Sequence, residues 1–232
     1  MYRPEDFISG GYFLVRRIPR PADVSELLPS TLTTLSNCFT DIAPDDWTLS
    51  GYNYSDDERA EEAAKFAIPR RVVPGLVRLF SDALGTQHSN AFPNLEVAEA
   101  FYKDCSEKDQ VMLVGIGLHQ SLLESLYAQR NDDVNQGYGL LERVELQNPL
   151  AELGEPLGFE LLGYSGTKFH SWLCHNAAVE ASEKFGVHPN RHGFIDSLDD
   201  AIRIVQNLKA TGAEPAIWEP WLVTKYAAIR SE

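Results

Sequence analysis

Apolar residues recur at two spacings along this chain, and the two spacings predict different elements. Alternation with a period of two, or a short apolar run bounded by turn-forming residues, is typical of a strand. One such run begins at Gly11 and is closed by Pro19 and Pro21. On this basis we predict strands over 11–18, 46–54, 111–117, 159–164 and 221–226.

The second spacing, three or four residues, predicts helices, and capping residues mark several of their ends. Ser55 and Glu58 match a capping box, in which each side chain satisfies a backbone donor of the other. Asn94 and Ser197 are placed to cap two further helices, and Gly186 is placed to end one. The predicted helices span 55–68, 70–84, 94–102, 120–129, 169–185 and 197–209.

These strands and helices follow one another irregularly, without the strict alternation of a doubly wound parallel sheet. The order therefore favours an α+β fold with a mixed, largely antiparallel sheet and several packed helices. We predict a single domain over 1–232. The stretch 130–158 holds much of the turn-forming material and is an alternative boundary between two lobes.

The net charge of the chain disfavours some classes of binding partner. The chain has 34 Asp and Glu against 20 Lys and Arg, a formal charge of −14 at pH 7. A nucleic-acid-binding protein presents a basic patch that replaces phosphate counterions, so this balance disfavours nucleic acid and anionic membranes as partners. The longest apolar run, 111–118, is far shorter than the ~20 residues that span a bilayer. With no signal-peptide pattern and three widely spaced cysteines, we expect a reduced, cytoplasmic protein.

Half of the acidic excess lies in one short stretch. Residues 41–62 contain eight acidic residues and one basic residue, Arg59, which gives a charge of −7. Aromatic side chains surrounded by carboxylates suit a surface that docks on a basic partner. Alternatively, the acids favour a helix N-terminus and the aromatic rings belong to the core. The predicted partner-binding residues are Asp45, Asp46, Trp47, Tyr52, Tyr54, Asp56, Asp57 and Glu61.

A second group of residues offers metal-ligand or nucleophile chemistry. His170 and Cys174 would share one face of the helix predicted over 169–185, and His188 and His192 repeat the same spacing. The pattern superficially resembles a zinc finger. A Cys–His catalytic pair is a further alternative, with Cys174 as nucleophile and His170 or His175 as base. Because the spacing is also explained by core packing and backbone hydrogen bonds, we predict no catalytic residue, no cofactor and no bound metal.

The C-terminal third carries a resemblance. The residues are Gly158–Tyr164 (GFELLGY), Phe169–Asn176 (FHSWLCHN), Asn190, Gly193–Asp196 (GFID) and the helix predicted next. This pattern, over about 158–223, resembles uncharacterised bacterial proteins that include immunity proteins of polymorphic toxin systems and contact-dependent inhibition.

The resemblance implies a non-catalytic protein that binds a cognate toxin domain with a basic surface and neutralises it stoichiometrically. A nuclease would suit such an acidic inhibitor, because carboxylates compete for a phosphate-binding cleft. Two alternatives stay open: a Cys/His-dependent or zinc-dependent hydrolase that uses the His170 and Cys174 region, and a general protein-interaction module.

Overall fold

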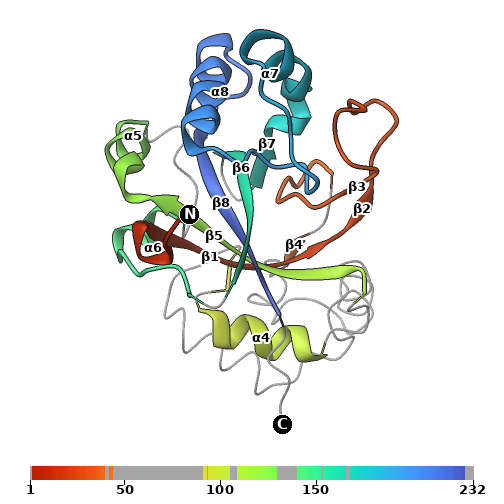
Figure 1. Ribbon diagram of the computed structural model, residues 1–232. Helices are drawn as coiled ribbons and strands as arrows, with labels where there is room; N and C mark the ends of the chain where they lie inside the picture. The colour runs from red at the N-terminus through yellow and green to blue at the C-terminus, as the bar shows by residue number, and fades with distance from the viewer. Residues whose placement is uncertain are drawn as a thin grey trace, which may run out of the picture.

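A six-stranded sheet lies at the centre of the part of the chain that the structure describes (Figure 1). The computed structural model describes residues 2–39, 42–43, 91–92, 94–104, 109–129, 140–152, 154–165 and 168–227. From edge to edge the strands are β4 (Ile42–Ala43), β1 (Phe7–Arg16), β5 (Val111–His119), β8 (Ile217–Tyr226), β6 (Glu155–Ser165) and β7 (Lys168–Ser171). Neighbouring strands pair antiparallel throughout. The two-residue strands β2 (Ile18–Pro19) and β3 (Thr31–Leu32) pair separately.

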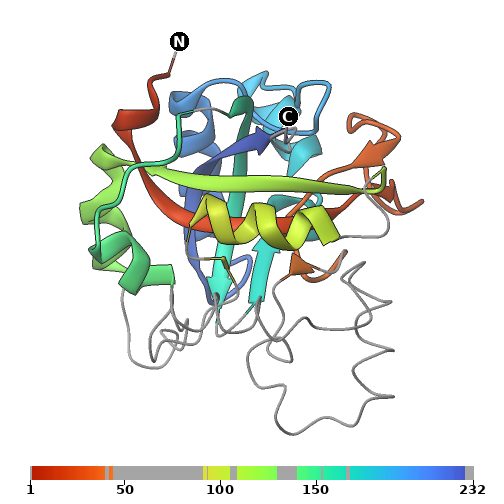
Figure 2. The ribbon, with the colours of Figure 1, turned by 90° about the horizontal axis from the view of Figure 1, so that it is seen from below.

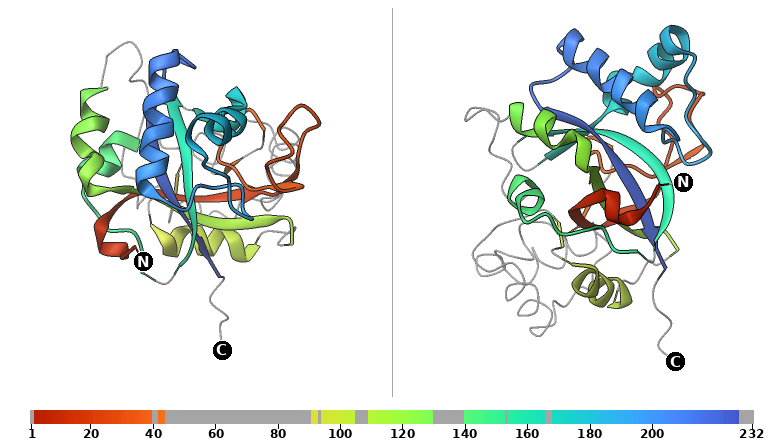
Figure 3. Two further views of the ribbon diagram at one scale, coloured as in Figure 1. Left: turned by 45° about the horizontal axis from the view of Figure 1, so that its top comes forward. Right: turned by 60° about the vertical axis from the view of Figure 1, so that its left-hand side comes forward.

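Helices cover the sheet from two sides. α4 (Leu95–Asp104) contacts β1 and β5, and Figure 2 shows it lying across these two strands. α8 (Leu198–Thr211) contacts β8 and β6 on the other side, with α7 (Ala177–Phe185) beside it (Figure 3, right). The other described helical segments are η1 (Pro4–Asp6), η2 (Gln120–Leu122), α5 (Leu123–Ala128), α6 (Leu140–Glu145) and η3 (Trp172–His175).

The α+β class is confirmed, and most of the testable elements lie where the sequence predicts them. The strands predicted over 11–18, 111–117, 159–164 and 221–226 correspond to β1, β5, β6 and β8. Asn94 Oδ1 accepts a hydrogen bond from Val97 N at 2.9 Å, and Ser197 Oγ accepts one from Asp200 N at 3.3 Å, as expected of helix caps. The elements predicted over 46–54, 55–68 and 70–84 lie outside the described residues.

The helix predicted over 169–185 was wrong in its first half. Residues 168–171 form β7, which pairs with β6 from Ser165 opposite Lys168 to Leu162 opposite Ser171. Ser171 then caps η3, since its hydroxyl accepts a hydrogen bond from Leu173 N at 3.3 Å. The α-helix starts only at Ala177. Its C-terminal cap is Gly186, as predicted. Pairing with β6 thus overrides the helical spacing of the apolar residues in this stretch.

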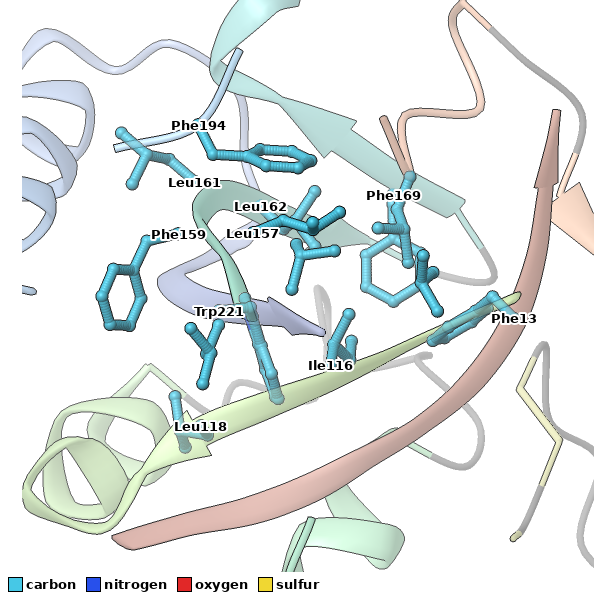
Figure 4. Packing of buried hydrophobic residues seen from close by; sticks show 14 of the residues in the cluster. Phe13, Ile116, Leu118, Leu157, Phe159, Leu161, Leu162, Phe169, Phe194 and Trp221 are labelled. Atoms are coloured by element: carbon cyan, nitrogen blue, oxygen red, sulfur yellow. The ribbon is translucent and has the colours of Figure 1, made fainter. Parts of the chain in front are cut away.

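The sheet curls around its apolar core. The rings of Phe13 on β1 and Phe169 on β7 meet edge to face with centroids 5.7 Å apart (Figure 4). In a flat sheet these strands, four positions apart, would be separated by about 19 Å. Trp221, Phe159 and Ile116 come from the strands between them and belong to the same contiguous cluster. The curl therefore brings the edge strand β7 close to the segment that follows β1.

The outer edge of β1 holds both ends of one long stretch of chain. Opposite the side that pairs with β5, Ala43 of β4 pairs with Leu14. Two residues along the same edge, Phe92 pairs with Tyr12 through hydrogen bonds of 3.1 and 2.8 Å. Residues 44–90 therefore connect two points that lie about 7 Å apart along one strand. We call residues 44–90 the excursion.

A glycine on β1 leaves room for the chain where residues 91–92 come back to pair with this strand. Gly11 has a φ of +113°, which side chains rarely adopt, and it lies at a bulge in the pairing of β1 with β5. A Cβ at Gly11 would approach the Cβ of Ala91 to 2.4 Å. The absence of a side chain at Gly11 therefore leaves room for Ala91 just before Phe92 pairs.

The position of these two ends predicts that the excursion can be excised. Replacing residues 44–90 with two glycines should give a protein that still unfolds cooperatively, because Ala43 and Phe92 keep their partners on β1. Thermal unfolding followed by circular dichroism measures this.

The matched control replaces residues 44–92 with the same linker. It also removes Phe92, which is fully buried and packs on Phe101 with ring centroids 4.9 Å apart. We expect this variant to lose a further 3–5 kcal/mol, roughly, as for other buried Phe truncations. Equal stability of the two deletions would contradict the assigned pairing, and loss of cooperative unfolding in the first would show that the excursion is needed for folding.

Candidate functional site

Residues 33–38 run along the outer edge of β7 and form one wall of the candidate site. Asn37 imitates a strand residue there: its backbone N donates to Phe169 O at 2.9 Å, and its Oδ1 accepts from Phe169 N at 2.7 Å. An exposed strand edge invites pairing with other chains, and Asn37 occupies this one. The segment that carries Cys38 is thereby fixed against β7.

A buried carboxyl group forms hydrogen bonds with the same segment. Glu160 on β6 is fully buried and accepts hydrogen bonds from Thr34 Oγ1 and, at 3.0 Å, from Leu35 N. Thr34 Oγ1 in turn accepts from Ser36 N at 3.0 Å. Burial raises the pKa of Glu160 from 4.5 to about 7, although hydrogen bonds from Thr34, Leu35 and Ser171 oppose the rise. The carboxyl group is therefore poised between its neutral and ionised forms near neutral pH.

Three thiol and imidazole side chains meet above this anchor. Cys38 Sγ lies 3.7 Å from Nδ1 of His170, and the two sulfur atoms and one ring nitrogen of His170 all lie within 4.8 Å of one another. We call these three residues the Cys–His–Cys group. They come from residues 33–38, β7 and η3 respectively, so that three separate segments supply one side chain each.

Polar contacts orient both the sulfur atoms and the imidazole. Cys174 Sγ lies 3.2 Å from Ser36 Oγ and accepts a hydrogen bond from Ser171 N at 3.4 Å. On the open side, Glu214 Oε2 lies 3.2 Å from His170 Nδ1 and 3.4 Å from His175 Nε2. The Glu214 side chain is 38 % exposed, whereas that of His170 is 15 % exposed. The group thus lies at the boundary between core and solvent.

The geometry is poorly suited to a nucleophilic thiol. Burial raises the pKa of the Cys174 thiol to about 11, so that the thiol stays protonated at neutral pH. In a Cys–His–acid triad the thiol and the carboxylate form hydrogen bonds with different nitrogens of the imidazole. Here Cys38 and Glu214 both face Nδ1 of His170. One nitrogen cannot both accept the proton of the thiol and donate to the carboxylate.

The structure brings together only part of the metal-ligand set considered from the sequence. His170 and Cys174 meet, but from a strand and a 3₁₀ turn rather than from one helical face. His188 Nδ1 lies 3.3 Å from Ser182 Oγ, and His192 Nε2 accepts from Arg191 Nε at 2.9 Å, so neither histidine contributes. The third member is Cys38, which sequence reasoning missed because it is 132 residues from His170 and carries no local spacing signal.

The predicted partner-binding residues lie outside the described residues. They are Asp45, Asp46, Trp47, Tyr52, Tyr54, Asp56, Asp57 and Glu61, all of them in the excursion. The described neighbours that fix this stretch are Cys38 and β4 on one side and Ala91 and Phe92 on the other.

Comparison with known proteins found no match to a protein-family model, a curated protein or a solved structure. Among the residues described, no helix has the length and apolar character needed to cross a membrane.

The buried carboxyl of Glu160 predicts a specific pH dependence of stability. Between pH 4.5 and about 7 the folded protein retains a proton that the unfolded chain has lost, so this group lowers stability as pH rises. Relative to Glu160→Gln, which does not titrate, the free energy of unfolding of the wild type should fall by up to about 1.4 kcal/mol per pH unit across this window. Urea unfolding at several pH values measures the difference.

Asn37→Ala is the control for loosening of the same segment. It removes the acceptor of Phe169 N without changing the carboxyl, so it should lower stability while keeping the pH slope of the wild type. Parallel slopes in the wild type and in Glu160→Gln would contradict a raised pKa at Glu160.

Proposed function

We propose that this chain is a non-catalytic acidic binding protein, an immunity protein that binds a cognate toxin domain and blocks it stoichiometrically in the cytoplasm. The observation that carries the proposal is the placement of the acidic stretch. Of the eight acidic residues in 41–62, all but Asp41 lie in the excursion, whose two flanking residues pair with positions two residues apart on β1. Residues 44–90 are thus attached at both ends to one edge of β1, and they carry the predicted partner-binding residues.

Electrostatics supports a basic partner. Residues 44–62 contain seven acidic residues and a single basic residue, Arg59. Trp47, Tyr52 and Tyr54 lie between the acidic residues in the sequence. Clustered carboxylates accelerate the approach of a basic surface, and aromatic side chains supply contact area that survives desolvation. A nuclease cleft that binds phosphate has the complementary charge.

The resemblance of residues 158–223 to proteins that include immunity proteins supports the same class. These residues contribute β6, β7, β8 and the helices α7 and α8. The pKa of about 11 at Cys174 and the shared use of His170 Nδ1 by Cys38 and Glu214 also favour a non-catalytic role over a thiol hydrolase.

A protection assay tests the proposal. The protein encoded directly upstream of this gene is expressed in bacteria with or without the chain, and growth is followed. We expect the wild type to restore growth and to form a 1:1 complex with the toxin domain. Reversing Asp45, Asp46, Asp56 and Asp57 to Lys should slow association at low salt by at least about tenfold and flatten its salt dependence.

The matched control makes the same change in charge at four exposed acidic residues of the described surface, Asp23, Glu26, Glu152 and Glu183. This variant should protect like the wild type. Equal effects of the two variants would move the interface away from the excursion. No protection by the wild type would refute the immunity function, and protection at far below one molecule per toxin would indicate a hydrolase instead.

A further inference from the structure

We propose that Cys38, His170 and Cys174 form a zinc-binding site. Two thiols and one imidazole are the ligand types that zinc takes most often in proteins, through sulfur and nitrogen. No continuous motif contains them, because Cys38 reaches the other two only when residues 33–38 lie along β7. The proposed zinc site does not depend on the proposed toxin binding, and it is tested separately.

The distances between the ligand atoms fit a tetrahedral ion. Bond lengths of about 2.3 Å to sulfur and 2.0 Å to nitrogen place sulfur and nitrogen about 3.5 Å apart, and two sulfur atoms about 3.8 Å apart. Cys38 Sγ and His170 Nδ1 are 3.7 Å apart, and the whole set lies within 4.8 Å.

A carboxylate is available for the fourth position. Glu214 Oε2 lies 3.2 Å from His170 Nδ1, close to the roughly 3.3 Å expected between an oxygen and a nitrogen bound to the same zinc ion. Glu214 is not among the residues whose ligand atoms all lie within 4.8 Å of one another, so its side chain would have to rotate to reach an ion held by Cys38, His170 and Cys174. Its negative charge also offsets the charge of the ion. A rotation of Glu214 onto the ion would supply the fourth ligand that structural zinc sites have.

The groups around the ligands are those that a metal site needs. Ser171 N donates to Cys174 Sγ at 3.4 Å, and Ser36 Oγ lies 3.2 Å from the same sulfur. Ser36 Oγ also accepts a hydrogen bond from Cys38 N at 3.2 Å. One hydroxyl thus orients the backbone of one ligand and the sulfur of another. Such contacts hold ligand atoms in place before the ion arrives.

The buried network beneath the site explains why residues 33–38 are held firmly enough. Glu160 and Asn37 fix this segment to β6 and β7 through four hydrogen bonds, described above. Cys38 is itself exposed, so solvent and ions have access to the site. A zinc ion would connect residues 33–38 to β7 and η3 through metal bonds in addition to these hydrogen bonds.

Metal analysis and cobalt titration of the full chain test the site. Protein purified without chelators should contain about one zinc ion per chain. After removal of zinc, Co²⁺ should bind with thiolate-to-cobalt charge-transfer absorption, and Zn²⁺ should displace it. We expect Cys38→Ser and His170→Gln to weaken Zn²⁺ binding at least tenfold, and Ser36→Ala to weaken it by roughly tenfold.

A control variant leaves the site intact. His188→Gln changes the other candidate histidine spacing and should bind cobalt like the wild type. Circular dichroism of the metal-free variants separates loss of a ligand from loss of the fold. Because Cys38 is exposed, its substitution tests the site even if Cys174→Ser does not fold.

Three results would overturn the proposal. The first is the absence of thiolate-to-cobalt absorption in the reduced wild type. The second is full cobalt affinity in Cys38→Ser. The third is a Cys38–Cys174 disulfide in protein purified without reductant, found by mass spectrometry of peptides, with no metal uptake after reduction. The last result would identify the pair as a redox-active disulfide.

Discussion

The carboxyl group of Glu160 is the interaction on which the candidate site depends. It lies in the core of the curled sheet, and its partners are a hydroxyl and a backbone amide of the segment after β3. A buried carboxyl without partners would destabilise the fold by several kcal/mol, roughly. The fold therefore favours the one path of the chain that supplies both donors. That path continues along β7 and ends with Cys38 next to His170.

Local signals in the sequence predict the elements but not their neighbours. Asn94 and Ser197 mark helix starts by a mechanism that acts within four residues, and the structure confirms both. The position of β8 between β5 and β6 depends on pairings distant in the sequence, and no local pattern reports it. The same limit applies to the candidate site. His170 and Cys174 attract attention by their spacing, whereas Cys38 joins them through the curl of the sheet.

The mistaken start of the helix at 169 has the same origin. Phe169 and Trp172 have helical spacing, but the hairpin with β6 uses Phe169 as an inward-facing strand residue against Phe13. His170, next along the strand, then points away from that core toward Cys38 and Glu214. Strand geometry, with its alternation of faces, is what makes one residue core and its neighbour a ligand. A continuous helix would have placed His170 and Cys174 on one side, without Cys38.

The attachment of residues 44–90 to one edge of β1 has a consequence for how such a protein can diversify. Both junctions lie on a single strand, so the pairings of Ala43 with Leu14 and of Phe92 with Tyr12 set the distance between the two ends, whatever the length of chain between them. Homologous chains can therefore differ in the length of this stretch while keeping the order of the sheet.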